Sequence, residues 1–411
     1  MDILLSAKGG GITSRMAVED FAAGYRQSLL DRAASDRSGS AESVFSTTCA
    51  TIEAAIATHQ NLLKRLNSLI ENVAAATPST NLRELTGQFY SNLYLYFGHF
   101  NSAPAFYQLS MAFMRQLSTT ITARALDQLG LFAHHLPEMT LIAIGPAGRC
   151  EYSPFCPLQL LLVHGKVAES QLQTITLFCQ TIHSEFEETG LFIDPVVTPR
   201  NTLWRGTLAD WQQRCEDALR PQAEEELINL CRLVDQYPLH PVEGLAPEFK
   251  KISSTILGGS RAAQANLIER MKSLSNGLGL MGGLKLERSG GGRGQFRLLD
   301  HGLLPLSTAL SALSLITSST SISNSERIQE LLKRRELDVE LAERMLATWH
   351  SLHGLRLRRE QSFQIERHIN QPLFLNPHEL TAEQRQSLEA ALESVAFIQR
   401  HVEIIFSGMR E

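Results

Sequence analysis

The sequence predicts a mostly helical α+β protein, in which a small mixed sheet with its helices is flanked by N- and C-terminal helical domains. Apolar residues recur at spacings of three and four over residues 15–135, and again from about residue 246 onward. Between these parts, residues 139–240 contain short continuous apolar runs, which are typical of buried strands. The length of 411 residues is long for one hydrophobic core, and the pattern divides it into three predicted domains: residues 1–100, 101–245 and 246–411.

The N-terminal part is predicted to be a helical bundle. Residues 43–76 form an amphipathic pattern that ends at the breaker TPST. Residues 84–100 carry aromatic side chains on several faces, which more often pack against a neighbouring helix than form a ligand wall. A third helix is predicted over residues 102–130. The adjacent His134 and His135 point different ways and are interpreted as a helix end or surface rather than as metal ligands.

The central part is the only α/β region. Two runs predict buried strands: MTLIAI at residues 139–144 and LQLLLV at 158–163. Three further segments are predicted to be a helix over residues 167–190, a third extended segment over 190–199, and a helix over 204–219 that is capped by Thr207. Residues 224–237 predict a helix and one last strand.

From residue 246 the chain is predicted to be helical, except at residues 282–299. Two short alternating runs flank a glycine tract there, and this tract lacks the Lys-Ser/Thr of a phosphate-binding P-loop, so it is interpreted as a hairpin tip. Three helices follow, at residues 324–335, 338–363 and 381–406. We expect Asn324 or Ser325 to cap the first, and a Thr381–Gln384 capping box to open the last.

The composition limits the partners and the compartment. The formal net charge of -5 and the pI near 6.2 give no electrostatic reason to expect binding to nucleic acid or to an anionic membrane. No apolar run approaches the roughly 20 residues of a membrane span, so we expect a cytoplasmic protein. None of the six cysteines forms a C-x-x-C pair, which favours buried free thiols over a zinc site.

One motif carries chemistry. The glycine turn GPAGRCE at residues 145–151 follows the first predicted strand, and CPLQLLLV at 156–163 forms the second. Metal-dependent nucleotidyl transfer uses such a turn to bring backbone N–H groups and a hydroxyl to a triphosphate. Two carboxylates at i and i+2 on the next strand then hold Mg²⁺, and a third acid comes from a later strand. Here the second strand carries no acid.

These residues resemble the G-S-x-G-R-x-E and D-x-D motifs of bacterial nucleotidyltransferases related to the uridylyltransferase that modifies the PII signal protein. Residues 201–211 are similar to the family's N-P-x-W-R-x-S-L-x-x-W segment. Four motifs resemble its helical substrate-binding-like domain, at residues 302–306, 325–327, 355–361 and 376–385. The resemblance covers residues 100–411 in the family's order. It implies a nucleotidyltransferase-like sheet, and Mg²⁺ with a nucleoside triphosphate in an active member.

This sequence departs from the family pattern at the residues that would bind phosphate and metal. Pro146 replaces the family serine and lacks both its hydroxyl and its backbone N–H. Pro157 and Gln159 occupy the two metal-binding aspartate positions, so no catalytic residue and no metal site are predicted. Four family residues remain and form a candidate residual nucleotide or phosphate turn: Gly145, Gly148, Arg149 and Glu151.

Outside the two lost positions, three acids are candidates for a remaining role in the site. Asp235 is a candidate residual acid, although Tyr237 stands where the family has an arginine. We expect Glu151 to pair with Arg149 or a backbone amide, and Asp194 to cap a turn. Two new carboxylates converging on one ion are improbable by chance.

The sequence therefore favours a degenerate nucleotidyltransferase-like protein that is catalytically inactive and acts as a signalling scaffold or sensor. Two alternatives stay open: an active metal-dependent nucleotidyltransferase that modifies a regulatory protein, and a plain helical protein-interaction module. No cofactor is expected for the first interpretation. Its expected partners are a protein, a nucleotide bound without metal, and a second copy of the chain in a homodimer.

Overall fold

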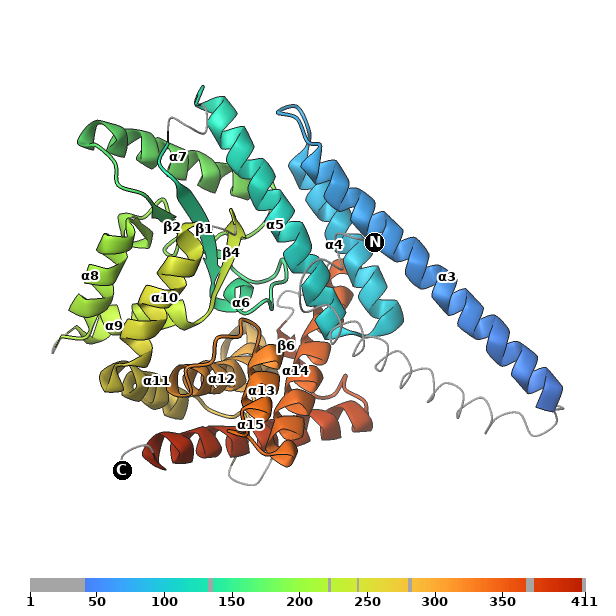
Figure 1. Ribbon diagram of the computed structural model, residues 1–411. Coiled ribbons are helices and arrows are strands. Elements are labelled where there is room, and N and C mark those ends of the chain that lie inside the picture. The colour runs from blue at the N-terminus through green and yellow to red at the C-terminus, as the bar shows by residue number, and fades with distance from the viewer. Residues whose placement is uncertain are drawn as a thin grey trace. The chain divides into compact units, whose positions relative to one another are not determined.

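The computed structural model describes residues 41–131, 136–220, 223–241, 244–279, 283–366 and 373–408 (Figure 1). The chain forms two compact units, Met1–Thr120 and Ile121–Glu411. The interpretation of His134 and His135 falls outside the described residues. The three-domain division at residues 100 and 245 stays a prediction.

The first unit consists of helices in its described part, as the apolar spacing predicts. Its helices are α3 (Ala41–Ala74), α4 (Leu82–Phe100) and the first part of α5 (Ala103–Gln128). The rings of Phe89 and Phe113 stack with centroids 4.0 Å apart, which joins α4 to α5. The aromatic residues of α4 therefore pack against a neighbouring helix, as expected.

The second unit contains the predicted mixed sheet. Its four strands are β1 (Met139–Ile144), β2 (Gln159–His164), β3 (Arg205–Gly206) and β4 (Gln236–His240), in the order β3-β2-β1-β4. β1 pairs antiparallel with both β2 and β4, whereas β2 and β3 run parallel. All six residues of β2 are buried, which explains why its sequence is a continuous apolar run and not an alternating one.

Further helices accompany the sheet in this unit. They are α7 (Glu169–Glu188), α8 (Leu208–Ala218), α9 (Glu224–Leu230) and α10 (Leu245–Gly258) (Figure 1). α10 contacts β1, β2 and α8. Trp211 of α8 is fully buried, meets the ring of Phe249 edge to face at 5.4 Å, and donates Nε1–H to the carbonyl of Leu162 at 3.4 Å. Thr207 caps α8 as predicted, because its Oγ1 accepts the N–H of Asp210 at 3.2 Å.

The expected extended segment over residues 190–199 exists only in its first part. Ile193 forms a single parallel bridge with Leu158, and the chain then bends. The bend arises because Oδ1 of Asp194 accepts the N–H groups of Val196 and Val197, at 2.9 and 3.0 Å. Asp194 therefore caps a turn, as expected. The third strand of the sheet, β3, comes from residues further along the chain, Arg205–Gly206.

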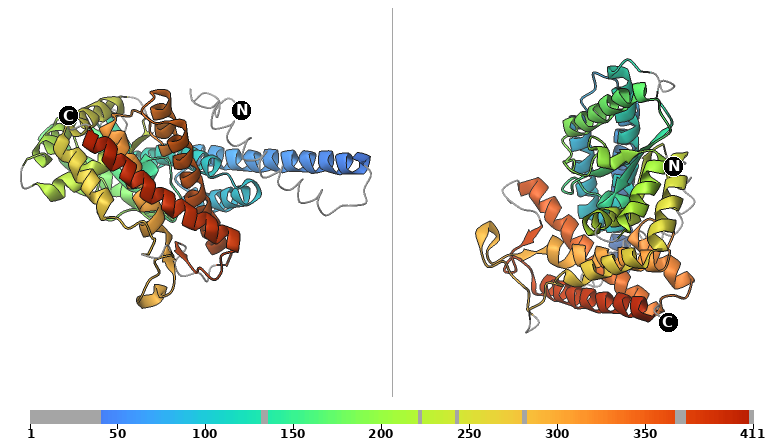
Figure 2. Two further views of the ribbon diagram at one scale, coloured as in Figure 1. Left: turned by 90° about the horizontal axis from the view of Figure 1, so that it is seen from below. Right: turned by 90° about the vertical axis from the view of Figure 1, so that its left-hand side faces the viewer.

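The C-terminal region is helical around one apolar helix. Its elements are α11 (Arg261–Ser273), a π-helix (Leu299–Leu303), α12 (Leu304–Ile316), α13 (Asn324–Lys333), α14 (Val339–Glu366) and α15 (Ala382–Gly408). α12 contacts α10, α11, α13 and α15, and Figure 2 shows this grouping from two further sides. In the described residues, one window, Leu299–Ile316, is long and apolar enough to cross a membrane, and 78% of it is buried inside the protein.

Two local predictions in this region need correction. α13 is capped by Ser323, whose Oγ accepts the N–H of Glu326 at 3.3 Å, so the expected caps Asn324 and Ser325 are wrong. Ser323 is the last residue with an extended backbone, whereas Asn324 is already helical and buried. The capping box of Thr381 and its partner glutamine at the start of α15 is confirmed.

The described part of the glycine tract, residues 283–299, forms a hairpin, as predicted. Leu286 bridges Phe296, and a 3-10 turn at Gly290–Gly292 reverses the chain. The second arm, β5 (Phe296–Arg297), also pairs antiparallel with β6 (Phe374–Leu375), a strand that the sequence does not reveal. Two-residue strands are set by their pairing partner and carry no periodicity of their own.

Candidate nucleotide-binding pocket

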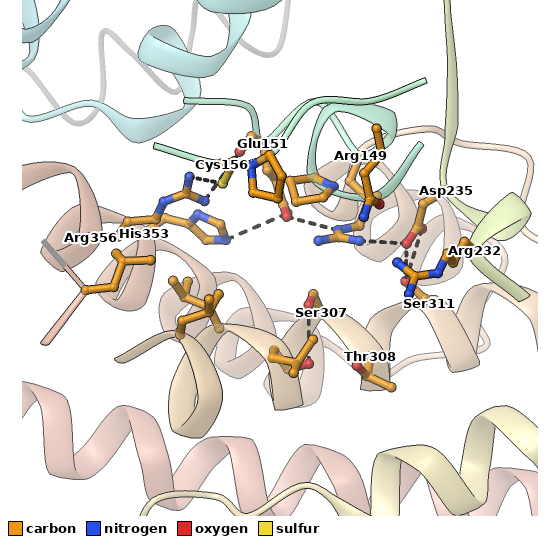
Figure 3. Close-up of a pocket in the computed structure, with 18 of the residues that line it drawn as sticks. Arg149, Glu151, Cys156, Arg232, Asp235, Ser307, Thr308, Ser311, His353 and Arg356 are labelled. Atoms are coloured by element: carbon orange, nitrogen blue, oxygen red, sulfur yellow. Dashed lines mark hydrogen bonds and ion pairs between the residues drawn. The ribbon is translucent and has the colours of Figure 1, made fainter. Parts of the chain in front are cut away.

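The glycine turn and the C-terminal helices enclose a pocket of about 260 Å³ within the second unit (Figure 3). The turn after β1 and the beginning of β2 form one side. Residues of α11, α12 and α14 form the other. The motif found in the sequence therefore lines a real cavity, and the C-terminal domain contributes to it.

Close contacts leave no room for a side chain at either glycine of the turn. Gly145 has φ +64°, and a Cβ on it would lie 2.5 Å from Oε1 of Gln159. A Cβ on Gly148 would lie 2.2 Å from the backbone oxygen of Asp235 at the start of β4. Both glycines therefore have a packing reason in this protein, whether or not a phosphate binds here.

The two positions that hold metal ligands in the family face the pocket. Pro157 and Gln159 both line it. Nε2 of Gln159 donates to Oδ2 of Asp194 at 2.8 Å, and its Oε1 lies against Gly145. A neutral amide, already hydrogen-bonded, thus occupies the place of the second carboxylate.

Glu151 is the centre of a buried hydrogen-bond network. Its carboxylate accepts from Nε of Arg149 at 3.0 Å, Nδ2 of Asn324 at 2.8 Å and Nε1 of Trp349 at 2.7 Å. Burial by itself disfavours the charged form, but His353, Arg149 and the hydrogen bonds from Trp349 and Arg149 together lower the pKa of Glu151 to about 2. The expected pairing of Glu151 with Arg149 is confirmed.

His353 lies at the edge of this network. Its Nε2 is 3.7 Å from Oε1 of Glu151. Burial, reinforced by the charges of Arg356 and Arg149, lowers the pKa of His353 to about 3, although Glu151 opposes the shift. His353 is therefore neutral at neutral pH.

Asp235 accepts hydrogen bonds on both carboxylate oxygens. Nη1 of Arg149 donates to Oδ2 at 2.7 Å, and Nη1 of Arg327 donates to Oδ1 at 2.7 Å. The hydroxyl of Ser311 on α12 lies 2.8 and 3.0 Å from the two oxygens. Asp235, the candidate residual acid, directly precedes β4 and thus joins this strand's beginning to the turn and to two C-terminal helices.

A second buried network surrounds Arg356. Its guanidinium donates to Glu360 at 2.8 Å, and to Ser153 and Sγ of Cys156 at 2.6 Å each. Ser153 in turn donates to Glu360 at 2.9 Å. Burial raises the pKa of the Cys156 thiol despite this guanidinium, so the thiol stays protonated and serves packing, not nucleophilic chemistry. All six cysteines are free, but Cys49 and Cys150 are only partly buried, so the expectation of buried thiols holds for the other four.

These donors do not fit a catalytic magnesium site. Mg²⁺ requires oxygen ligands in near-octahedral geometry. Within the described ranges, no three His, Cys, Asp or Glu side chains converge as a metal site. The two carboxylates that line the pocket, Glu151 and Asp235, already accept hydrogen bonds from arginine. We therefore derive no metal-dependent step here.

The sequence predicted no site role for five residues of the networks, although Asn324 was an expected helix cap and Arg327 lies in the motif at 325–327: Ser311, Asn324, Arg327, Trp349 and His353. A signal existed for two of them. Asn324 and Arg327 continue the spacing of buried Leu331 along α13, so they lie on its buried face. Polar side chains on an apolar helix face need partners, and those partners lie far away in the sequence.

Comparison with known families agrees with this architecture. Residues 94–225 match the model described as "Putative nucleotidyltransferase DUF294". Residues 261–406 match the model described as "Putative nucleotidyltransferase substrate binding domain", DUF294_C. No curated protein matches the chain.

Proposed function

We propose that the chain, whose residues 94–225 and 261–406 match the DUF294 nucleotidyltransferase model and its substrate-binding-domain model, is a catalytically inactive member of this family that acts as a signalling scaffold or sensor. The observation that supports this proposal is that non-acidic residues stand at the two positions where the family motif has its metal-binding aspartates. Pro157 and Gln159 line the pocket where an active transferase presents two aspartates. Neither side chain can hold Mg²⁺ as a carboxylate does.

The remaining acids are poor replacements for the lost pair. To bind a metal, Glu151 and Asp235 would have to leave Arg149, whose side chain is only 12% exposed. Removing one partner from a buried ion pair costs about 3–5 kcal/mol. The two carboxylates thus contribute to the stability of the fold in their present positions.

The signalling role is supported by the resemblance of residues 100–411 to bacterial relatives of the PII-modifying uridylyltransferase. A member without transfer activity acts through binding. We propose that it binds a protein partner or forms a homodimer in a bacterial cytoplasm, without nucleic acid, a membrane or a resident cofactor. Its pocket would report the presence of a small ligand to that partner.

Calorimetry with each of the four nucleoside triphosphates, with Mg²⁺ and with EDTA, tests the proposal. We expect no affinity that depends on Mg²⁺, because the donor set for the ion is missing. Mg²⁺-dependent binding with a micromolar or lower Kd would instead favour the active transferase with displaced acids. Transfer of a labelled nucleotide to any protein would also overturn the proposal. If no nucleotide binds under either condition, the inactive member stands and its role is scaffolding.

A further inference from the structure

Two arginines line the pocket without a carboxylate bound to either. Arg232 lies on the 3-10 helix Cys231–Val234, and Arg270 lies in the last turn of α11. In the part of the chain that the structure describes, neither guanidinium makes a hydrogen bond or an ion pair within 4.0 Å. Nε of Arg232 is buried and has no hydrogen-bond partner there. A buried donor without a partner is costly, and here it borders a cavity.

The electrostatics of this end of the pocket differ from those of the other arginines. Burial and the charge of Arg270 lower the pKa of Arg232, and only the charge of Asp194 opposes them. Arg149 and Arg356, which also line the pocket, already donate to carboxylates. Of the four arginines that line the pocket, Arg232 and Arg270 are therefore the two whose charge is not neutralised by a directly bound carboxylate.

Hydroxyl groups face the same space. Ser307 and Thr308 of α12 line the pocket, and Figure 3 shows them on the helix opposite the ion pair of Arg149 and Asp235. The Ser307 hydroxyl has a partner in the carbonyl of Leu304 at 3.2 Å. The Thr308 hydroxyl has none in the described ranges and is free to donate to a ligand.

We propose that this pocket binds a phosphate-bearing ligand without a metal ion, with one phosphate held between the guanidiniums of Arg232 and Arg270. The inference rests on the proposed function, because the two arginines supply the positive charge that Mg²⁺ supplies in an active transferase. The planar fork of a guanidinium matches phosphate oxygens in a bidentate way.

The volume specifies the class of ligand. About 260 Å³ lies just below the range of roughly 300–1,000 Å³ that encloses a drug-sized molecule. The cavity therefore accommodates a di- or triphosphate group, and a nucleoside attached to it would extend toward the pocket opening. Free pyrophosphate and the polyphosphate of a nucleotide share this chemistry.

Calorimetry on the full chain in EDTA tests the inference, with inorganic phosphate, pyrophosphate and the four nucleoside triphosphates as probes. We expect pyrophosphate or a triphosphate to bind in the absence of metal, with an affinity that falls as salt is raised. Arg232→Gln and Arg270→Gln should each raise the Kd at least about tenfold, as expected for the loss of a charge-assisted hydrogen bond. Arg288→Gln, at an exposed position outside the pocket, makes the same charge change and should leave the Kd unaltered.

The probes also distinguish the two sources. If pyrophosphate binds as tightly as a triphosphate nucleotide, the site recognises the oligophosphate alone. If one nucleotide binds at least tenfold tighter than pyrophosphate, the nucleoside contributes contacts, and the ligand is that nucleotide. Both results support the inference.

Other outcomes overturn it. If the wild-type protein binds none of the probes in EDTA or with Mg²⁺, the inference is wrong and the proposed function is unaffected. If binding requires Mg²⁺, the proposed function is wrong as well. Binding that survives both Arg232→Gln and Arg270→Gln excludes this site. Thermal unfolding checks that each variant folds, and Arg232→Gln should not lower the melting temperature, because it removes a repulsion.

Discussion

Arg149 and Asp235 form a buried ion pair, with Nη1 2.7 Å from Oδ2, although 86 residues separate them in the sequence. The same guanidinium holds Glu151 at 3.0 Å. Arg149 thus links the glycine turn to the residue that directly precedes β4. Four predictions follow from this arrangement and its neighbours.

Arg149→Met should destabilise the second unit by about 3–5 kcal/mol, because it leaves two buried carboxylates without their shared cation. Urea unfolding followed by tryptophan fluorescence measures the change. All three tryptophans, Trp204, Trp211 and Trp349, lie in residues 121–411, so the signal reports this unit alone.

Arg220→Met is the matched control for this measurement. Arg220 pairs with Asp217 at 2.7 Å, but its side chain is 68% exposed. Exposed pairs contribute about 0–1 kcal/mol. Equal losses in the two variants would show that the Arg149 network does not stabilise the fold.

His353→Gln should flatten the pH dependence of stability between about pH 6.5 and 4.5. In the folded protein His353 has a pKa of about 3 and stays neutral, whereas in the unfolded chain it takes up a proton near 6.5. The unfolded state therefore binds more protons than the folded state in this window. As the pH is lowered, this one histidine reduces the free energy of unfolding by up to about 1.4 kcal/mol per pH unit. The lowered pKa of Glu151 adds a loss in the same direction below about pH 4.5.

Urea unfolding at pH 8, 6.5, 5.5 and 4.5 measures this effect. The difference in slope between wild type and His353→Gln isolates one histidine, since the other titratable groups remain. Glutamine is uncharged at every one of these pH values and keeps a polar side chain near the carboxylate of Glu151. Identical slopes would mean that His353 takes up its proton in the folded protein at the same pH as in the unfolded chain.

Gly148→Ala should destabilise the second unit by more than 2 kcal/mol, because its Cβ would lie 2.2 Å from the backbone oxygen of Asp235 and β4 would have to move. Gly354→Ala, inside α14, is the control. Its Cβ meets only the flexible end of Arg358 at 3.4 Å, and alanine favours a helix interior by roughly 0.5–1 kcal/mol. Similar melting temperatures for the two variants would contradict the close approach of the turn to β4.

Pro146→Ser, Pro157→Asp and Gln159→Asp introduced together should create Mg²⁺-dependent nucleotide binding. Positions 157 and 159 both line the pocket, and Asp194 already lies within hydrogen-bonding distance of the side chain at 159. The three changes would place three carboxylates near the turn, which is a donor set that Mg²⁺ accepts.

Calorimetry with and without Mg²⁺ measures the gain in the restored variant. Pro146→Ser, Pro157→Asn and Gln159→Asn together form the control, because they have the same sizes without the charge. A restored variant that binds no better than this control would mean that the cleft itself has been remodelled.

Much of the fold was predictable because local patterns encode it. The continuous apolar runs of β1 and β2 and the amphipathic spacing of the helices each reflect burial along one element. Two caps, those of α8 and α15, were predicted because a hydroxyl stands three residues before its partner. The cap of α13 was missed because Ser323, Asn324 and Ser325 are all good caps, and only the burial of Asn324 against Glu151 selects among them.

The sequence by itself determined that the glycine turn retains the glycines and the arginine of the family motif, and that proline and glutamine stand where this motif has its two aspartates. These are facts of residue identity, and neither a proline nor a neutral amide can supply the negative charge of a carboxylate in any fold. Only the tertiary structure decided what the remaining charges do. It paired Arg149 with Glu151 and Asp235 and left Arg232 and Arg270 facing a cavity. Which charges meet depends on the distances between elements that are far apart in the chain. The periodicity of a single helix or strand carries no information about these distances.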